Sequence, residues 1–384
     1  MTYEHLFSPC VVGPRTAPNR FVSQAMEAND GENGVPGERA RERYRKLARG
    51  KWGVVIVEAL SVSETSLARK NGMVIQRKHL DAYKRLVDEY KRIDPDSILL
   101  FQITHSGYRS GSFSEKTAIC PEHEKDARYL SADEIESIRE AFVEGVLIAE
   151  AAGADGVDVK SCHGYFGAEM LRPANTRTDT WGGGFENRTR FLRESVEEMK
   201  AKIHNRSFVL GSRLSLYEGI RGGCGTVGKD EIVEDLSEMF DVIRLMAKLG
   251  MHYVNVSAGI PAATPDITRP TAPSKHLQLH HLRYTKAVKE LKLPLAVFGS
   301  AYSFPKADSL TLAEEMISKG YTDFAGWGRQ SFADPLFPDK VKRGENVNYC
   351  TACSGCTKLM LAQVNDGCIM YDEYYKGLMR TISK

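Results

Sequence analysis

Eight short apolar runs, rich in β-branched residues, recur along the chain and constrain its fold more than any other feature. They cover residues 20–24, 54–58, 98–103, 156–160, 208–214, 253–256, 295–298 and 324–327. Between most of them lie helical patterns, for example over residues 80–93, 132–152, 187–203, 233–249 and 309–319. Eight strands that alternate with helices predict an α/β fold of the (β/α)8 TIM-barrel type.

The main alternative is a doubly wound sheet, which would place a glycine-rich phosphate turn directly after the first strand. No such turn follows the run at residues 20–24. We therefore expect one barrel over residues 1–343 and a short cysteine-rich extension over residues 344–384. No nicotinamide-binding domain is expected after the extension.

The charge balance of the chain points away from polyanionic partners. The 384 residues include 52 basic and 50 acidic side chains, which give a formal net charge of +2. Such a balance gives no broad electrostatic reason to bind nucleic acid or a membrane surface. No apolar stretch approaches the ~20 residues of a membrane span, and the first residues lack a signal-peptide pattern. We expect a small-molecule substrate and leave a homo-oligomer open.

Half of the eight cysteines lie close together near the end of the chain. Cys350, Cys353, Cys356 and Cys368 follow the pattern C-x2-C-x2-C-x11-C. Soft thiolates select zinc or an iron–sulfur centre. A zinc site usually uses two separated C-x2-C pairs, so this triple with one distal cysteine favours a [4Fe–4S] cluster. Zinc and ordinary buried thiols remain the alternatives.

The carboxyl ends of the predicted strands carry a set of polar residues where a barrel places its chemistry. The last two strands end in the glycine-containing turns FGSA and GWGRQ. Backbone N–H groups can approach a phosphate closely at such turns, and Arg329 adds a bidentate donor. These two turns predict a phosphate site at Gly299, Ser300 and residues 326–329.

Several segments together resemble the Old Yellow Enzyme family of FMN-dependent oxidoreductases. They are NRFVSQAM (19–26), FQITHSG (101–107), CHGYF with RTDTWGGGFENRTRF (162–191), GSRLS (211–215), VSAG (256–259) and GWGRQSFADP (326–335). The resemblance runs from residue 6 to about residue 368. The cysteine pattern is similar to the iron–sulfur branch of the family, which includes 2,4-dienoyl-CoA reductase and trimethylamine dehydrogenase.

The resemblance implies FMN and a [4Fe–4S] cluster as cofactors, and it assigns the residues that hold them. The cluster ligands would be the four clustered cysteines. The flavin-binding residues would be Ser23, Gln24, Ala25 and Met26 along the ring, Ala59 at its edge, Gln102 on the pyrimidine side, Arg213 near N1 and O2, and Gly299, Ser300, Gly328 and Arg329 at the phosphate. A guanidinium at Arg213 would stabilise the anionic reduced flavin.

Three residues are implied to act on the substrate. Tyr165 matches the family's proton donor, and a phenol of ordinary pKa is protonated at neutral pH. Lys160 and His163 stand where relatives usually have a His/Asn pair that binds the substrate carbonyl. Lys160 could bind a carboxylate or a developing enolate, or could pair with Glu27 or Asp158. Glu27 departs from the family pattern too, and it would oppose flavin reduction unless paired or protonated.

The resemblance implies an ene-reductase type of flavin-dependent oxidoreductase. It would reduce an activated C=C bond of an α,β-unsaturated carbonyl or carboxylate compound, with hydride from flavin N5 and a proton from Tyr165. The electron donor would be NAD(P)H or a separate reduced electron-transfer protein. The alternatives are an amine-type dehydrogenase that runs in the opposite direction, or a catalytic subunit that depends on a partner. A cluster-bearing enzyme favours a reducing, cytoplasmic location.

Overall fold

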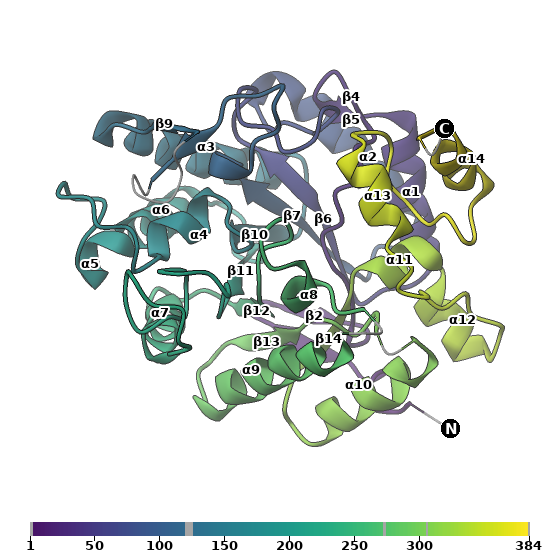
Figure 1. The fold of residues 1–384 in the computed structure, drawn as a ribbon. Coiled ribbons are helices and arrows are strands. Elements are labelled where there is room, and N and C mark those ends of the chain that lie inside the picture. Colours follow the sequence, from purple (N-terminus) through teal and green to yellow (C-terminus); the bar gives the residue numbers. More distant parts are fainter. Residues whose placement is uncertain (1–2, 120–125, 272–273, 305, 383–384) are drawn as a thin grey trace.

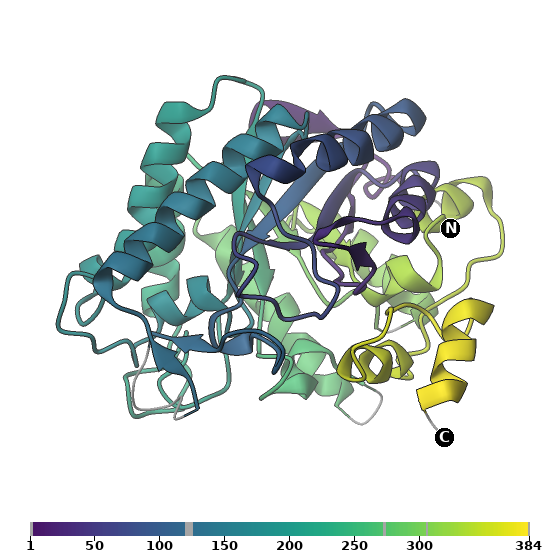
Figure 2. The same ribbon diagram turned by 90° about the horizontal axis from the view of Figure 1, so that it is seen from above.

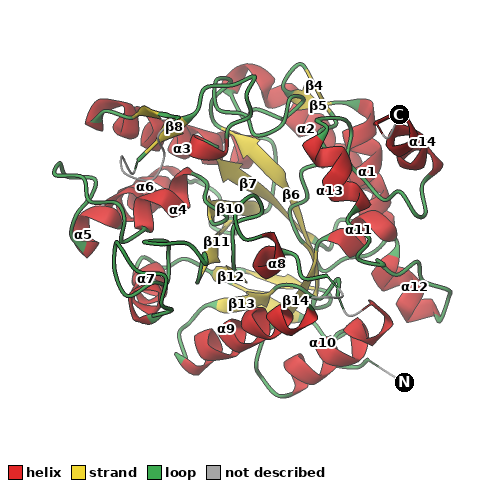
Figure 3. Cartoon of the chain, viewed as in Figure 1, coloured by secondary structure: helices red, strands yellow, loops and turns green. Residues whose placement is uncertain are grey.

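A closed barrel of eight parallel strands forms the centre of the protein (Figures 1 and 3). The structure is a computed structural model that describes residues 3–119, 126–271, 274–304 and 306–382. The neighbouring strands run in the order β10-β11-β12-β13-β14-β3-β6-β7, and β7 pairs with β10 to close the ring. The predicted TIM barrel is therefore confirmed.

All eight predicted strands are present, with bounds within three residues of those expected. They are β3 (Phe21–Ser23), β6 (Val54–Ser61), β7 (Ile98–Thr104), β10 (Gly156–Ser161), β11 (Val209–Ser215), β12 (Tyr253–Ser257), β13 (Ala296–Gly299) and β14 (Phe324–Trp327). β6 runs longer than expected, and its register against β7 shifts between Val57 and Leu60. Such irregularities often lie beside active sites.

The strands bury both of their faces, as parallel strands covered by helices do. Side chains on one face meet inside the barrel, among them Val54, Ile56 and Phe298. Side chains on the other face, such as Val55 and Val57, pack under the helices. A short hairpin of β1 (Cys10–Val12) and β2 (Arg15–Ala17) contributes to the inner cluster.

A ring of helices surrounds the barrel (Figure 2). The longer ones are α1 (Glu38–Arg49), α2 (Leu80–Ile93), α3 (Ala132–Ala151), α6 (Arg190–Lys202), α7 (Ser237–Lys248), α9 (Gln278–Glu290) and α10 (Ser309–Ser318). The α3 helix begins at a capping box in which the Ser131 hydroxyl accepts from Glu134 N–H and the Glu134 carboxylate accepts from Ser131 N–H. This exchange satisfies N–H groups that a helix start leaves without partners.

The sequence 223–228 spells G-x-G-x-x-G but does not form a dinucleotide-binding turn. It lies in the long loop between β11 and α7, whereas the nucleotide motif sits in a short turn from a strand into a helix. Among the described residues, no helix has the length and apolarity required to span a membrane.

The cysteine-rich extension folds back onto the barrel. After α12 (Phe337–Arg343) ends at Gly344 in the left-handed conformation, the chain forms α13 (Gly355–Leu361) and α14 (Glu373–Ile382). Both helices, yellow in Figure 1, lie on the side of the barrel that carries α1 and α11 (Arg329–Ala333). The Asp366 N–H donates to Ala28 O at 2.7 Å, and the Asn29 side chain donates to Val364 O at 3.0 Å.

Candidate active site

A cavity of about 570 Å³ opens at the carboxyl ends of the barrel strands. This volume falls within the range of small-molecule sites. Its wall carries five basic side chains and two carboxyl groups: Arg69, Arg109, Lys160, Arg269 and Arg329, with Glu27 and Asp366. The remaining wall includes Ala25, Met26, Gln102, His163, Tyr165, Pro261, Ala262, Pro265, Cys356, Thr357, Met360 and Leu361.

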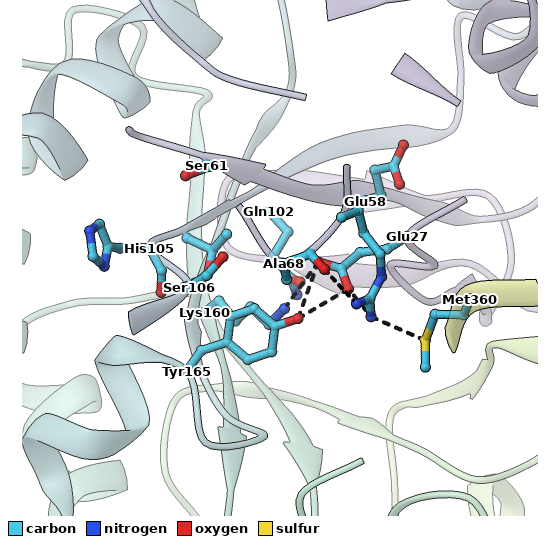
Figure 4. Close-up of polar contacts among 12 residues, drawn as sticks. Glu27, Glu58, Ser61, Ala68, Gln102, His105, Ser106, Lys160, Tyr165 and Met360 are labelled. Atoms are coloured by element: carbon cyan, nitrogen blue, oxygen red, sulfur yellow. Dashed lines mark hydrogen bonds and ion pairs between the residues drawn. The ribbon is translucent and has the colours of Figure 1, made fainter. Parts of the chain in front are cut away.

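The three predicted catalytic residues all line this cavity, and Glu27 joins two of them. The Tyr165 hydroxyl donates to the Glu27 carboxylate at 3.1 Å, and the Lys160 ammonium lies 3.8 Å from it. Lys160 Nζ also lies 3.2 Å from the centre of the Tyr165 ring, a close cation–π contact. Figure 4 shows these three side chains pointing toward one another. Lys160 therefore pairs with Glu27 and not with Asp158, which accepts instead from Gln102 and Tyr253.

A fourth side chain, Arg69, completes this cluster. Its guanidinium lies 2.9 Å from the Glu27 carboxylate and contacts the sulfur of Met360 in α13. Burial opposes the ionisation of Glu27, but the charges of Lys160 and Arg69 outweigh it and lower the Glu27 pKa below its ordinary value. Glu27 is therefore a carboxylate at neutral pH. Burial raises the pKa of Tyr165, and the negative charge of Glu27 raises it further, so the phenol keeps its proton.

The backbone after β10 turns sharply to present these groups. His163 and Gly164 both have positive φ, at 63° and 73°, and Tyr165 then caps the start of α4 (Phe166–Leu171). A positive φ is rare for a residue with a side chain and is often found at functional sites. Two hydroxyls hold His163: its N–H donates to Ser215 Oγ at 3.0 Å, and its Nε2 lies 2.7 Å from Ser257 Oγ.

His163 is electrically neutral in this setting. Burial lowers the pKa of its imidazole well below the ordinary value, and the charge of Arg213 lowers it further. A neutral ring can donate or accept one hydrogen bond without adding charge to the cavity. The bond to Ser257 occupies Nε2, so a substrate oxygen would need to compete with that serine for the ring nitrogen.

The residues predicted for the flavin ring form a hydrogen-bonded network beneath the cavity. Gln24 exchanges two bonds with Asn255, at 3.0 and 2.8 Å, and accepts from the Arg213 guanidinium. Arg213 also donates to Ser257 and Ser300, yet its Nε is buried without a hydrogen-bond partner. An unpartnered buried donor beside a cavity of this size fits a polar ring such as that of FMN.

The predicted flavin residues divide by position. Four of them line the cavity, namely Ala25, Met26, Gln102 and Arg329. Ser23 and Gln24 line a smaller adjoining hollow. Ala59 is buried in β6 at the register shift, and Gly299 ends β13. At Gly328 a Cβ atom would lie 2.9 Å from the Met26 sulfur, so a side chain here would have to displace the end of Met26.

The four clustered cysteines occupy one stretch of the extension. Cys350 is buried, Cys353 is exposed, Cys356 lines the cavity and Cys368 lines a separate groove beside α1. Burial raises the pKa of Cys368, and the charges of Cys350 and Cys353 add to the rise, which indicates that these sulfurs are neighbours. Within the described ranges, no three His, Cys, Asp or Glu side chains converge closely enough to hold a single metal ion.

The donor chemistry of these thiols suits an iron–sulfur cluster better than a single ion. A cubane cluster spreads its four ligands around several irons, so its cysteines need not converge on one point. A zinc ion would hold its sulfurs at about 2.3 Å from one centre. The structure therefore does not confirm a cluster at these cysteines, and its presence remains a prediction.

Sequence reasoning missed several residues of this cavity. Arg69 and Arg269 come from the loops after β6 and β12, beyond the strand ends themselves, and Thr357 and Met360 come from α13. Basic residues are common in exposed loops, so their types alone gave no signal. Pro261 and Pro265 from the loop after β12 also line the cavity, while residues 272–273 of that loop lie outside the described residues.

Comparison with known proteins identifies the family. The model of the NADH:flavin oxidoreductase / NADH oxidase family matches residues 5–348, most of the chain. An NADH oxidase from Thermoanaerobacter brockii is 27% identical over 371 residues, which cover 92% of this chain and 54% of that protein. The chain thus spans about half the length of this relative.

Two solved structures share the fold over nearly the whole chain. A 2-naphthoyl-CoA reductase in complex with 2-naphthoyl-CoA is 24% identical with a TM-score of 0.80, and the match covers 96% of this chain and 57% of that one. A histamine dehydrogenase from Rhizobium sp. 4-9 is 25% identical with a TM-score of 0.76, over 96% of this chain and 52% of that one. Both are similar to the present chain in the barrel and in the segment that follows it.

Proposed function

The chain belongs to the NADH:flavin oxidoreductase / NADH oxidase family and is a flavin-dependent oxidoreductase, and from this premise we propose that it is an ene-reductase. Its substrate is an α,β-unsaturated carbonyl or carboxylate compound. It holds FMN above the barrel and a [4Fe–4S] cluster in the extension. Electrons come from NAD(P)H or from a separate reduced electron-transfer protein. Thiolate ligands of this kind favour a reducing compartment such as the cytoplasm.

The observation that carries this proposal is the position of the Tyr165 hydroxyl. It lies in the wall of a ligand-sized cavity, across from the Ala25–Glu27 segment, and it is held by the Glu27 carboxylate. The raised pKa of Tyr165 keeps the phenol protonated, as a proton donor to carbon requires. When bound, FMN supplies the hydride, and the cluster supplies single electrons.

The other side chains of the cavity hold and polarise the substrate. His163 presents a neutral ring that can bond to a carbonyl oxygen when that oxygen displaces Ser257 from Nε2. The Lys160 ammonium stands over the Tyr165 ring and favours negative charge that develops on a substrate oxygen nearby. Arg213 stands ready to meet negative charge on the pyrimidine side of the flavin, because its Nε has no protein partner.

The second candidate is a dehydrogenase of the amine type, which the similarity to a histamine dehydrogenase favours. The charged side chains of the cavity wall argue against a dehydrogenase of the amine type. Five basic side chains against two carboxyl groups produce a positive field that repels an ammonium substrate. We therefore keep the reductase as the proposed function.

The experiment that tests the proposal is an anaerobic spectrum of the purified protein with iron, sulfide and flavin quantified. NADH, NADPH and chemically reduced ferredoxin are offered in turn as donors, and cyclohexenone is then added as the acceptor. We expect donor-dependent bleaching of the flavin band and its recovery with the enone. If a reduced flavin persists after the enone but an amine reduces the oxidised protein, the dehydrogenase direction replaces this proposal.

A further inference from the structure

We propose that Arg269 forms an anion-binding subsite of this cavity, and that the subsite receives the carboxylate of an unsaturated carboxylic acid substrate. The inference rests on the proposed function, because it names the substrate class of the same site. It assigns carboxylate binding to Arg269, whereas the sequence indicated Lys160 as the residue that could bind an anionic group.

The geometry argues against Lys160 and Arg69 as the residues that bind the substrate carboxylate. Both contact the same carboxylate, Glu27, at 3.8 and 2.9 Å, and Lys160 also lies against the Tyr165 ring. Their charges are therefore already balanced in part by the protein. An incoming carboxylate at this point would have to share them with Glu27, which is itself ionised.

Arg269 differs from them because every contact it makes is with a neutral group. Its guanidinium donates to Thr357 Oγ1 at 3.2 Å and to the Pro261 carbonyl at 3.3 Å, and it approaches the Met360 sulfur at 4.0 Å. Within the part of the chain that the structure describes, no carboxylate lies within ion-pair distance of it. Arg269 is partly buried in the cavity wall.

A partly buried guanidinium without a carboxylate is costly, since Arg keeps its charge under all ordinary conditions. Burial and the positive charges of Arg329 and Arg69 disfavour the charge of Arg269. Cys356 and Asp366 favour it but do not outweigh them, because the pKa of Arg269 stays below its ordinary value. An anion placed at Arg269 relieves both effects. The cavity itself supplies only Glu27 and Asp366 against its five basic side chains.

The phosphate of FMN does not remove this excess, because Arg329 is placed to receive it. Arg329 follows the glycine turn at the end of β14, where the family holds the phosphate, and it donates to the Pro270 carbonyl at 3.0 Å. That bond holds the backbone at Pro270, the residue after Arg269. Arg269 itself lies toward α13, where its partner Thr357 also lines the cavity.

The guanidinium of Arg269 indicates which chemical group of the substrate the subsite would bind. A guanidinium offers two parallel N–H groups that match the two oxygens of a carboxylate, whereas an ester has no charge and only one strong acceptor. The inferred substrate is therefore an enone that also carries a free carboxylate. A neutral ester of the same shape would lose this contact.

The test separates binding from reaction. Levulinate and methyl levulinate have no C=C bond to reduce and differ only in the free acid. Their affinities for the oxidised holoenzyme are measured by calorimetry, for the wild type and for the variants R269Q, R269K and R244Q. R244Q changes an exposed arginine on α7 that pairs with Asp241. FMN content is measured for each protein before titration.

We expect the wild type to bind levulinate about tenfold to a hundredfold more tightly than its ester, as a charged hydrogen-bonded pair would give. R269Q should abolish this preference while leaving ester binding within about threefold. R269K should restore part of it, because it keeps the charge without the planar fork. R244Q should behave as the wild type.

Three results would overturn the inference. One is equal affinity of the wild type for acid and ester, and another is a preference for the acid that survives in R269Q. The third is loss of FMN in R269Q with FMN retained in R244Q, which would assign Arg269 to the cofactor. Acetylacrylate and its methyl ester are offered separately as acceptors, so failure of the ene-reductase proposal appears as absence of turnover with both.

Discussion

Glu27 shows how one side chain can organise a site. Its carboxylate accepts a hydrogen bond from the Tyr165 hydroxyl, forms an ion pair with Arg69 and offsets the charge of Lys160. A carboxylate this close to the expected flavin would by itself disfavour reduction, because it repels the anionic reduced ring. The two cations offset that charge. Lys160 and Arg69 therefore allow the Glu27 carboxylate to hold Tyr165 without leaving uncompensated negative charge beside the expected flavin.

The Tyr165→Phe variant tests the role of the hydroxyl directly. Removal of a positioned proton donor lowers the rate of such a step by about 10²–10⁴-fold. We expect reoxidation of the reduced flavin by cyclohexenone to slow within this range. Reduction of the flavin by its donor should stay near the wild-type rate, because the phenol is not needed for that half of the cycle. Stopped-flow absorbance measures both halves, and equal slowing of the two would contradict the assignment.

The Glu27→Gln variant makes a prediction about pH. The negative charge of Glu27 raises the pKa of Tyr165, whereas Lys160 and Arg69 lower it. Removing the negative charge leaves the two cations, so the Tyr165 pKa should fall. The rate of flavin reoxidation by an enone should then begin to decline at lower pH than in the wild type. A pH–rate profile checks this.

A control for that profile is Glu186→Gln, which removes an exposed carboxylate of α5 (Phe185–Arg188) that pairs with Arg193. Its alkaline decline should coincide with that of the wild type. If the decline of Glu27→Gln also coincides with it, Glu27 does not act on the proton donor.

At the residue scale, the sequence could predict residue types, strand ends and two possible partners of Lys160, but not which partner it takes. Lys160, His163 and Tyr165 follow one strand, so their shared cavity was expected, and it is found. The pairing of Lys160 with Glu27 joins opposite parts of the ring of strands. Only the closed barrel brings these parts together. Arg69 and Arg269 could not be identified at all, because a loop position carries no periodic signal.

At the scale of elements, the strands were predictable because their apolar runs are short, regular and buried on both faces. Two helices of the outer ring are not among the helical patterns quoted from the sequence as examples. α1 is mostly charged and buries only Ala40, Tyr44, Leu47 and Ala48. These four residues form one narrow apolar face on an otherwise charged helix. α9 likewise has a weak apolar face.

Gly211 in β11 allows a close approach inside the barrel. A Cβ atom there would lie 2.2 Å from the ring of Tyr253, which stacks on Phe298 and donates to Asp158 at 3.0 Å. We expect Gly211→Ala to lower the free energy of unfolding by about 1–3 kcal/mol, the usual cost of overpacking a core. Gly228→Ala has open space around its Cβ and should change stability by less than about 0.5 kcal/mol. Urea unfolding compares the two, and equal midpoints would refute the packing argument.

At the scale of the whole molecule, the extension is part of the active site and not an appendage. Thr357 and Met360 of α13 contact Arg269 and Arg69, and the segment at residues 363–366 bonds to residues 28–29 and 70. The sequence predicts a boundary at residue 343, which stays a prediction, and α12 ends at Arg343. It could not predict that the extension folds back over the cavity, because nothing local in the cysteine pattern sets its direction.

If the proposed cluster is bound, this arrangement predicts that iron content and local order around the cavity depend on one another. We expect the Cys368→Ser variant to fall well below about four irons per chain, because it removes a ligand of the proposed cluster. FMN should be retained, since the residues predicted to hold it lie in the barrel. Amide exchange at Asp366, whose N–H bonds to Ala28 O, should become faster as the extension loosens. Cys10→Ser, at the hairpin of β1, changes a cysteine outside the extension and should leave iron and exchange unchanged. If Cys368→Ser keeps its full iron and its protected Asp366 amide, the distal cysteine is neither a ligand nor an anchor of the cavity roof.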